Sequence, residues 1–209
     1  MSGAAPLRAA VLLSGTGRTF DHLLAESRAR RLPITLAGVV SSRGGARGAE
    51  RARAEGLECA VLRRRDFDSP AAYGDAIAAR LRGWRVELVL MAGFLHLWTI
   101  PADFAGRVMN IHPALLPAFG GAGMHGAHVH EAVIASGVRW SGCTVHFADN
   151  EYDRGPIILQ RTVPVAFEDT PETLAQRVFA EECAAYPEAI RLFAASRLEI
   201  VGRRVRVRP

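Results

Sequence analysis

The sequence contains no lysine, so all 26 of its basic side chains are arginines, and the net charge is +5 at pH 7 with neutral histidines. The arginines are scattered over helical segments or gathered in "LRRRD" and in the tail "GRRVRVRP", without aromatic residues between them. Sequence-specific or single-strand nucleic-acid binding usually combines a basic patch with a recognisable motif or stacking aromatics. The pattern therefore favours a solvated arginine-rich surface or an acidic small substrate, and we expect no nucleic-acid partner.

Cysteine and long hydrophobic runs are also scarce. Cys59, Cys143 and Cys183 are odd in number, far apart and lack C-x-x-C spacing, so the sequence indicates neither a disulfide framework nor a zinc site. No apolar run approaches the roughly 20 residues needed to span a bilayer. The apolar stretch near the first residue is soon broken by Gly15 and Gly17, so it does not read as a signal peptide. We expect a cytoplasmic protein with no membrane partner.

Several catalytic motifs are missing as well. There is no G-x-S-x-G elbow and no base close to Cys143 in the sequence, so covalent nucleophilic catalysis has no good candidate. The cluster "MHGAHVHE" holds His125, His128 and His130, but their spacing does not place them on one helix face. No acid or cysteine completes a tetrahedral ligand set there, and we expect no metal.

Alternating strands and helices are what the sequence does contain. The 209 residues are 49% apolar, which is enough for one large domain over residues 1–209. The first half alternates short apolar strands with helical segments, which is typical of βαβ units and of a parallel sheet covered by helices on both faces. We expect strands at 7–15, 34–42, 57–63, 86–93 and 107–112, and helices at 15–31, 44–56 and 69–84. A loop then precedes a helix at 127–137, strands at 141–148 and 156–165, a long helix at 169–196 and a two-stranded ribbon at 197–208.

Two polar residues interrupt the apolar strand "RVMNIH". Successive strand side chains point to opposite faces, so Asn110 and His112 lie on the same face at the end of the strand. Open α/β sheets bind ligands at the carboxyl ends of their strands. A buried structural histidine is the ordinary alternative, but this pairing before a Gly/Pro loop favours a functional site. Asn110 can donate a neutral N–H group, and His112 can donate or carry a proton near neutral pH.

The turn "SGTGRTF" follows the first strand and opens a helix. Backbone N–H groups at a helix N-terminus favour an anion. The turn lacks both the third glycine of a dinucleotide fingerprint and the ending of a P-loop. Arg18 and Thr19 instead suit a monophosphate on a small ligand, although an ordinary strand-to-helix turn explains the segment equally well.

The segment "GCTVHFADNEYDRGPIILQ" reads as a half-buried strand, a turn and a second strand. Thr144, His146 and Ala148 alternate with apolar residues in the first strand. Asp153 lies in the turn, where aspartate is commonly structural. Next to a histidine, however, its carboxylate could orient or charge the imidazole and receive a proton.

Two of these segments together resemble the signatures of the folate-dependent formyltransferase family. They are "NIHPALLP" and "GCTVHFADNEYDRGPIILQ", and the resemblance extends over roughly residues 9–200, in particular to the branch that acts in purine synthesis. It implies a Rossmann-like, mostly parallel twisted sheet and the catalytic residues Asn110, His112 and Asp153. It also implies that the N-terminal half binds phosphate and nucleotide, and that the C-terminal half binds folate and carries the catalytic residues.

The reaction implied by the resemblance is transfer of the formyl group of 10-formyltetrahydrofolate, as a cosubstrate, to the amine of glycinamide ribonucleotide. The amine would attack directly and form a tetrahedral intermediate. Asn110 and His112 would donate to its oxyanion, with His112 held as an imidazolium by Asp153. The substrate-binding positions carried over are Gly15, Thr16, Gly17, Arg18, Thr19, Ile111, Pro113 and Glu182. The folate-binding positions carried over are Phe94, Leu95, His96, Trp98, His146, Ala148 and Asp149.

Other functions stay open at this point. Formyltetrahydrofolate deformylase would use the same three catalytic residues to direct water at the formyl carbon. A noncatalytic nucleotide- or RNA-binding module would instead use the basic tail, and its binding would fall steeply with salt. The sequence is also compatible with a homodimer.

Overall fold

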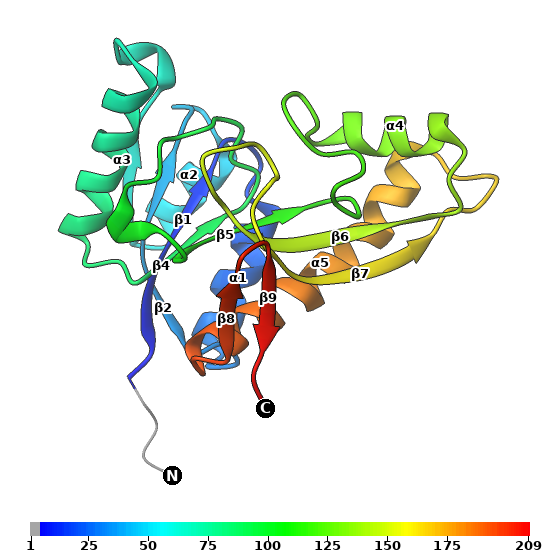
Figure 1. The fold of residues 1–209 in the computed structure, drawn as a ribbon. Helices are drawn as coiled ribbons and strands as arrows, with labels where there is room; N and C mark the ends of the chain where they lie inside the picture. Colours follow the sequence, from blue (N-terminus) through cyan, green and yellow to red (C-terminus); the bar gives the residue numbers. More distant parts are fainter. Residues whose placement is uncertain (1–4) are drawn as a thin grey trace. The chain divides into compact units, whose positions relative to one another are not determined.

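The structure is a computed structural model that describes residues 5–209 (Figure 1). It has an α/β fold in which helices flank a mostly parallel set of strands, as the alternation of apolar segments predicts. The residues group into two compact units, one ending at Met109 and one covering Asn110–Pro209. The prediction of a single domain is not tested by this grouping, and each unit is described by itself.

The first unit is built around four parallel strands in the order β3-β2-β1-β4. Its elements are β1 (Leu7–Leu13), α1 (Arg18–Arg28), β2 (Ile34–Ser41), α2 (Arg47–Ala54), β3 (Glu58–Val61), α3 (Pro70–Gly83) and β4 (Leu88–Met91). Two short 3-10 helices, Arg64–Asp66 and Ala102–Phe104, were not predicted. The βαβ order confirms the reading of the first half of the sequence.

Local sequence explains how these elements begin. The strand β1 is apolar and Ala9–Leu13 is fully buried, as expected of a central parallel strand. Ser69 caps α3, since its Oγ accepts a hydrogen bond of 3.0 Å from the Ala72 N–H. Gly17 precedes α1 with φ 80°, and a Cβ atom there would lie 2.6 Å from Gly48 Cα. Both the left-handed backbone and this close approach require glycine before α1.

The second unit contains a mixed set of strands and the longest helix. Strand β5 (Val108–His112) enters it at Asn110, and α4 (Ala127–Ser136), β6 (Trp140–Phe147), β7 (Ile157–Pro164), α5 (Pro171–Ala194), β8 (Leu198–Val201) and β9 (Arg204–Val207) follow. The order of the last four strands is β6-β7-β9-β8, with β6/β7 and β8/β9 antiparallel and β7/β9 parallel. Helix α5 packs on β6 and β7 (Figure 1).

The prediction that strand 141–148 is half-buried is wrong, because both faces of β6 are covered. One face packs on α5, where the ring centroids of Phe147 and Phe193 lie 6.4 Å apart in a tilted arrangement. On the other face, the Thr144 hydroxyl hydrogen-bonds with the backbone of Leu116. Ser141 through Phe147 are therefore buried. Polar and apolar residues alternate along β6 because one face packs on a helix and the other hydrogen-bonds to a loop, and not because one face is exposed to solvent.

The C-terminal helix and ribbon agree with the sequence. Thr170 caps α5 and forms a reciprocal capping box with Thr173. Asp169 precedes the cap and pairs with Arg177. Gly202, with φ 61°, forms the turn between β8 and β9. Among residues 5–209, the helices are all too short or too polar to cross a bilayer.

Candidate active site

Asn110, His146 and Asp153 come together from three separate segments of the second unit. Asn110 lies on β5, His146 on β6, and Asp153 in the turn that joins β6 to β7. The Asn110 Nδ2 atom is 3.1 Å from His146 Nε2 and 3.4 Å from Asp153 Oδ1. His146 Nδ1 is 2.9 Å from the Phe147 carbonyl oxygen, which can only accept. His146 Nδ1–H therefore donates to this carbonyl, and its Nε2 atom faces both Asn110 Nδ2 and Asp153 Oδ1, the latter at 3.7 Å.

His112 lies on the other side of the same carboxylate. Its Nδ1 atom is 3.6 Å from Asp153 Oδ2, and its Nε2–H group donates over 2.8 Å to the Phe119 carbonyl. The His112 side chain is only 5% exposed. Asp153 thus contacts both predicted oxyanion donors, Asn110 and His112, through its two oxygens.

Backbone geometry fixes the position of the Asp153 carboxylate. The residue has φ 54°, a left-handed conformation that aspartate and asparagine tolerate better than most side chains. Its Oδ2 atom also accepts a 2.9 Å hydrogen bond from the Gly121 N–H. Burial alone would raise the pKa of Asp153, but the contacts with His112, His146 and Gly121 outweigh it and hold the pKa below its usual value. The carboxylate is therefore charged at neutral pH.

The prediction that Asp153 holds His112 as an imidazolium stays a prediction, and burial of the ring acts against it. Burial lowers the pKa of His112 below its ordinary value, and His146 acts in the same direction. The Asp153 carboxylate and the Phe119 carbonyl both raise the pKa, but together they offset burial only in part. The 2.8 Å contact with the Phe119 carbonyl, which can only accept, places one proton on Nε2. A second proton on the ring requires a negatively charged group close to it, whose attraction offsets the free-energy cost of burying the positive charge.

This arrangement has the components for stabilising a developing oxyanion. Asn110 is oriented by His146 and donates to Asp153 over 3.4 Å, and a substrate oxygen can replace this longer contact. The Nε2–H group of His112 becomes a second donor when it exchanges Phe119 for a ligand. A buried carboxylate next to both donors can accept a proton from an attacking group. The cluster fits addition to a carbonyl carbon.

The predicted phosphate loop lies in the first unit. Gly15, Thr16 and Arg18 are exposed at the start of α1, which no side chain caps among the described residues. Just before the loop, the buried Ser14 hydroxyl accepts hydrogen bonds from Ser42 Oγ at 2.6 Å and from the Leu95 N–H at 3.0 Å. These hydrogen bonds connect the ends of β1 and β2 to the segment after β4, and they fix the position of the residue before the phosphate loop.

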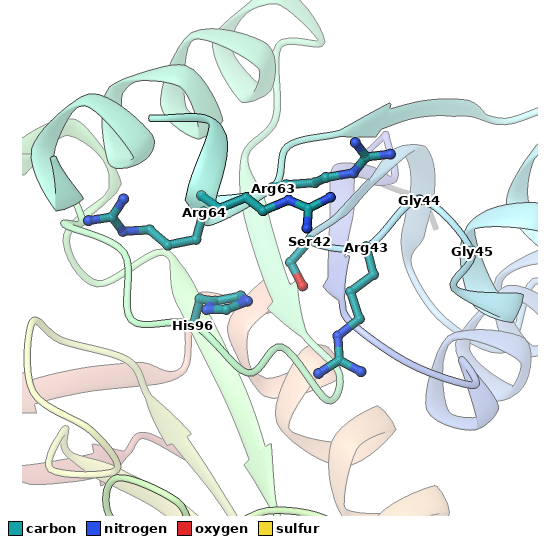
Figure 2. Close-up of a pocket in the computed structure, with 8 residues that line it drawn as sticks. Ser42, Arg43, Gly44, Gly45, Arg63, Arg64 and His96 are labelled. Atoms are coloured by element: carbon teal, nitrogen blue, oxygen red, sulfur yellow. The ribbon is translucent and has the colours of Figure 1, made fainter. Parts of the chain in front are cut away.

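A cationic pocket lies in the same unit (Figure 2). It has a volume of about 530 Å³ and is lined by Ser42, Arg43, Gly44, Gly45, Arg63, Arg64, Arg65 and His96. Within the described residues, Arg43, Arg63 and Arg64 take part in none of the ion pairs. Burial lowers the pKa of His96, and the charges of Arg43 and Arg64 lower it further. The pocket therefore favours an anion.

The other predicted positions are distributed over both units. Phe94 and Trp98 are buried in the first unit, Trp98 to 1% exposure, so their contact with a folate stays a prediction. Glu182 lies on α5 with 9% exposure. Asp149 follows β6, and its Oδ1 accepts the Glu151 N–H. The remaining predicted contacts, at Thr19, Ile111, Pro113 and Ala148, lie beside these positions in the sequence and likewise stay predictions.

Two features of the candidate sites were not predicted from the sequence: the backbone groups around His112 and Asp153, and the arginine cluster of the pocket. The Phe119 carbonyl and the Gly121 N–H complete the surroundings of His112 and Asp153, yet a backbone atom leaves no trace in residue types. The run of three arginines after β3 was interpreted as solvated surface. Its position directly after a strand was the signal for a pocket at the strand ends. No group of three His, Cys, Asp or Glu side chains within residues 5–209 could hold a metal ion.

Comparison with known proteins matches residues 7–190 to the family described as formyl transferase. Phosphoribosylglycinamide formyltransferase of Escherichia coli (strain K12) is 34% identical over 91% of this chain and 88% of its own length. The chloroplastic phosphoribosylglycinamide formyltransferase of Vigna unguiculata is 40% identical over 90% of this chain. The crystal structure of glycinamide ribonucleotide transformylase 1 from Symbiobacterium toebii has a TM-score of 0.92 and 42% identity, and covers 99% of this chain and 96% of that one.

The similarity has two limits. The chain spans 61% of the length of the Vigna unguiculata relative and 19% of the trifunctional purine biosynthetic protein adenosine-3 of Gallus gallus. A formyltetrahydrofolate deformylase from Pseudomonas syringae has a TM-score of 0.85 but only 20% identity, so that likeness shows a shared fold alone.

Proposed function

The chain belongs to the formyl transferase family, and we propose that it transfers the formyl group of 10-formyltetrahydrofolate to the amine of glycinamide ribonucleotide. The observation that carries this proposal is the contact of the Asp153 carboxylate with both Asn110 and His112. The names of relatives that are 34% and 42% identical over most of this chain support formyl transfer to this acceptor. The predicted cytoplasmic location stays a prediction, since one relative is named chloroplastic.

The folate cosubstrate supplies the formyl carbon, and this chain's residues handle charge and protons around it. The amine of the nucleotide forms a bond to that carbon, and the carbonyl oxygen takes up the negative charge. Asn110 Nδ2 and the His112 ring donate to this oxygen. The negative charge on this oxygen offsets the burial of a positive charge on the His112 ring. It therefore favours a ring that has taken a second proton from solvent, and the ring returns this proton when the oxyanion collapses.

Proton transfer completes the proposed reaction. The attacking amine loses a proton to the Asp153 carboxylate, directly or through one water. The carbonyl then re-forms as the bond from the formyl carbon to the folate nitrogen breaks, and that nitrogen takes up the proton held by Asp153, directly or through one water. One amine proton is thus exchanged for the formyl group, and Asp153 and His112 end in their starting protonation states.

Two further parts of the chain fit these substrates. We assign the nucleotide phosphate to the loop of Gly15 through Thr19, where an uncapped helix start favours an anion. We assign the glycyl amine to Glu182, a carboxylate that is almost fully buried on α5. The cationic pocket beside His96 suits the glutamate carboxylates that end a folate molecule.

A product assay separates this proposal from its nearest rival. Purified protein is incubated with 10-formyltetrahydrofolate, with and without glycinamide ribonucleotide, and formate and formylated nucleotide are measured. We expect formylated nucleotide only when the acceptor is present. Formate release at the same rate without the acceptor would favour the deformylase instead.

The pocket assignment has its own test. Arg43→Gln removes one charge from the pocket, and losing a charged hydrogen bond predicts a rise in the KM for the folate of about tenfold with little change in kcat. Arg53→Gln removes an exposed charge on α2 outside the pocket and serves as the matched control. An equal KM for both variants would contradict the assignment.

A further inference from the structure

The Thr144 hydroxyl is fully buried and uses its entire hydrogen-bonding capacity. Its Oγ1 atom donates to the Ala114 carbonyl over 2.7 Å and accepts the Leu116 N–H at 3.0 Å. It also accepts a hydrogen bond from Gln160 Nε2 at 3.0 Å. A hydroxyl has one donor and two acceptor positions, so no capacity is left over. Such a saturated buried group holds its neighbours in one arrangement.

Gln160 completes the connection from the neighbouring strand. It is the direct cross-strand partner of Thr144 in the antiparallel pair β6/β7. Its Nε2 atom donates to the Leu116 carbonyl at 3.0 Å as well as to Thr144. Both N–H groups of the amide are therefore engaged, and both polar backbone atoms of Leu116 are bound to side chains of the sheet.

The segment held in this way connects two groups of the active site. It leaves His112 at the end of β5 and is anchored to the sheet at Ala114 and Leu116. It then returns, so that the Phe119 carbonyl accepts from His112 and the Gly121 N–H donates to Asp153. In the sequence, the anchored residues 114–116 therefore lie between His112 and the backbone groups of Phe119 and Gly121.

From this geometry we propose that Thr144 and Gln160 are positioning residues for formyl transfer. They hold residues 114–116 against β6 and β7, and thereby fix the Phe119 carbonyl, which orients the His112 ring and its Nε2–H group until a substrate oxygen replaces this carbonyl. The inference rests on the proposed function, but the anchoring itself has consequences that do not need substrate. Neither side chain is assigned a contact with the reacting atoms.

The first test compares variants that remove or keep the hydroxyl. Thr144→Val keeps the shape but leaves the Leu116 N–H and the Ala114 carbonyl without their partner. A displacement of about 1 Å in a catalytic group can cost about 10²-fold, so we expect kcat to fall by that order. The KM for glycinamide ribonucleotide is expected to stay near its wild-type value. Thr144→Ser restores the hydroxyl and is expected to restore kcat.

Two further variants guard against a simple failure to fold. Gln160→Met acts at an exposed position, and we expect a smaller loss of kcat in the same direction. Ser141→Ala removes another buried hydroxyl of β6, one without a hydrogen-bond partner among residues 5–209, and is expected to keep wild-type kcat. Rates are normalised to active sites titrated with a tight-binding folate analogue, which removes the effect of unfolded protein.

The second test needs no catalysis. Hydrogen exchange of the Leu116 amide is expected to be slow in wild type and in Thr144→Ser, and faster in Thr144→Val. In an NMR titration, the pKa of His112 is expected to be lower in Thr144→Val, since the Phe119 carbonyl raises it in the intact protein. Wild type without transfer activity would refute the proposed function. Active wild type with unchanged kcat, exchange and titration in Thr144→Val would refute the positioning role.

Discussion

Replacing Asp153 by asparagine tests the role of the carboxylate with the least structural change. Asparagine has nearly the same shape and also tolerates the φ of 54° found at this position. Its amide oxygen can keep the 2.9 Å hydrogen bond from the Gly121 N–H. The amide nitrogen then faces Asn110 Nδ2, so a donor meets a donor where the carboxylate accepted over 3.4 Å.

The distances give the size of the effect. A carboxylate 3.6 Å from an imidazolium is worth about 4 to 5 kcal/mol at an effective dielectric constant of 20. The side chain of Asp153 is 12% exposed, so solvent screens part of this interaction. Loss of the charge makes protonated His112 harder to form and also removes the proton acceptor. We expect kcat to fall by about 10²–10³-fold, the usual range for losing one such electrostatic contribution.

The assay is the initial rate of formyl transfer at saturating concentrations of both substrates. Glu151→Gln neutralises an exposed carboxylate of the same turn and is the matched control. Circular dichroism and thermal unfolding establish that both variants are folded. If Asp153→Asn turned over as fast as Glu151→Gln, the carboxylate would have no role in the chemistry, and the reasoning from its contacts would be wrong.

Asn110→Ala is expected to lower kcat by about 10²–10³-fold, with an unchanged circular dichroism spectrum, because one oxyanion donor is lost. Burial lowers the pKa of His112 and of His130, so the unfolded chain takes up protons first as the pH falls. The free energy of unfolding in urea should therefore decrease below about pH 6.5, and equal values at pH 7 and pH 5 would contradict this. Burial raises the pKa of the fully buried Cys143 to about 12, so mass spectrometry should find it unmodified by iodoacetamide in the folded protein.

Patterns within one strand could be predicted well from the sequence. The period of two places Asn110 and His112 on one face, and a strand end followed by Pro113 is where open sheets bind ligands. Caps were equally visible, since Ser69 and Thr170 stand directly before prolines at helix starts. These features depend on neighbours in the sequence, which is why residue types suffice to find them.

Features that depend on distant segments could not be predicted in the same way. Nothing near Asp153 in the sequence indicates that His112 lies beside it, and only the family resemblance suggested that contact. The lowered pKa of His112 follows from burial by elements that the sequence does not place. The cationic pocket likewise forms only where Arg43, Arg63 and His96 meet at the ends of three strands.

The central claim is that Asn110, His112 and Asp153 act on one carbon atom. A crystal structure with a stable adduct that joins the nucleotide amine to a folate analogue through a tetrahedral carbon tests it most directly. The account predicts that the oxygen on that carbon lies about 3 Å from Asn110 Nδ2 and from the His112 ring, with the Asp153 carboxylate near the amine nitrogen. An adduct bound with its tetrahedral carbon out of reach of these three side chains would contradict it.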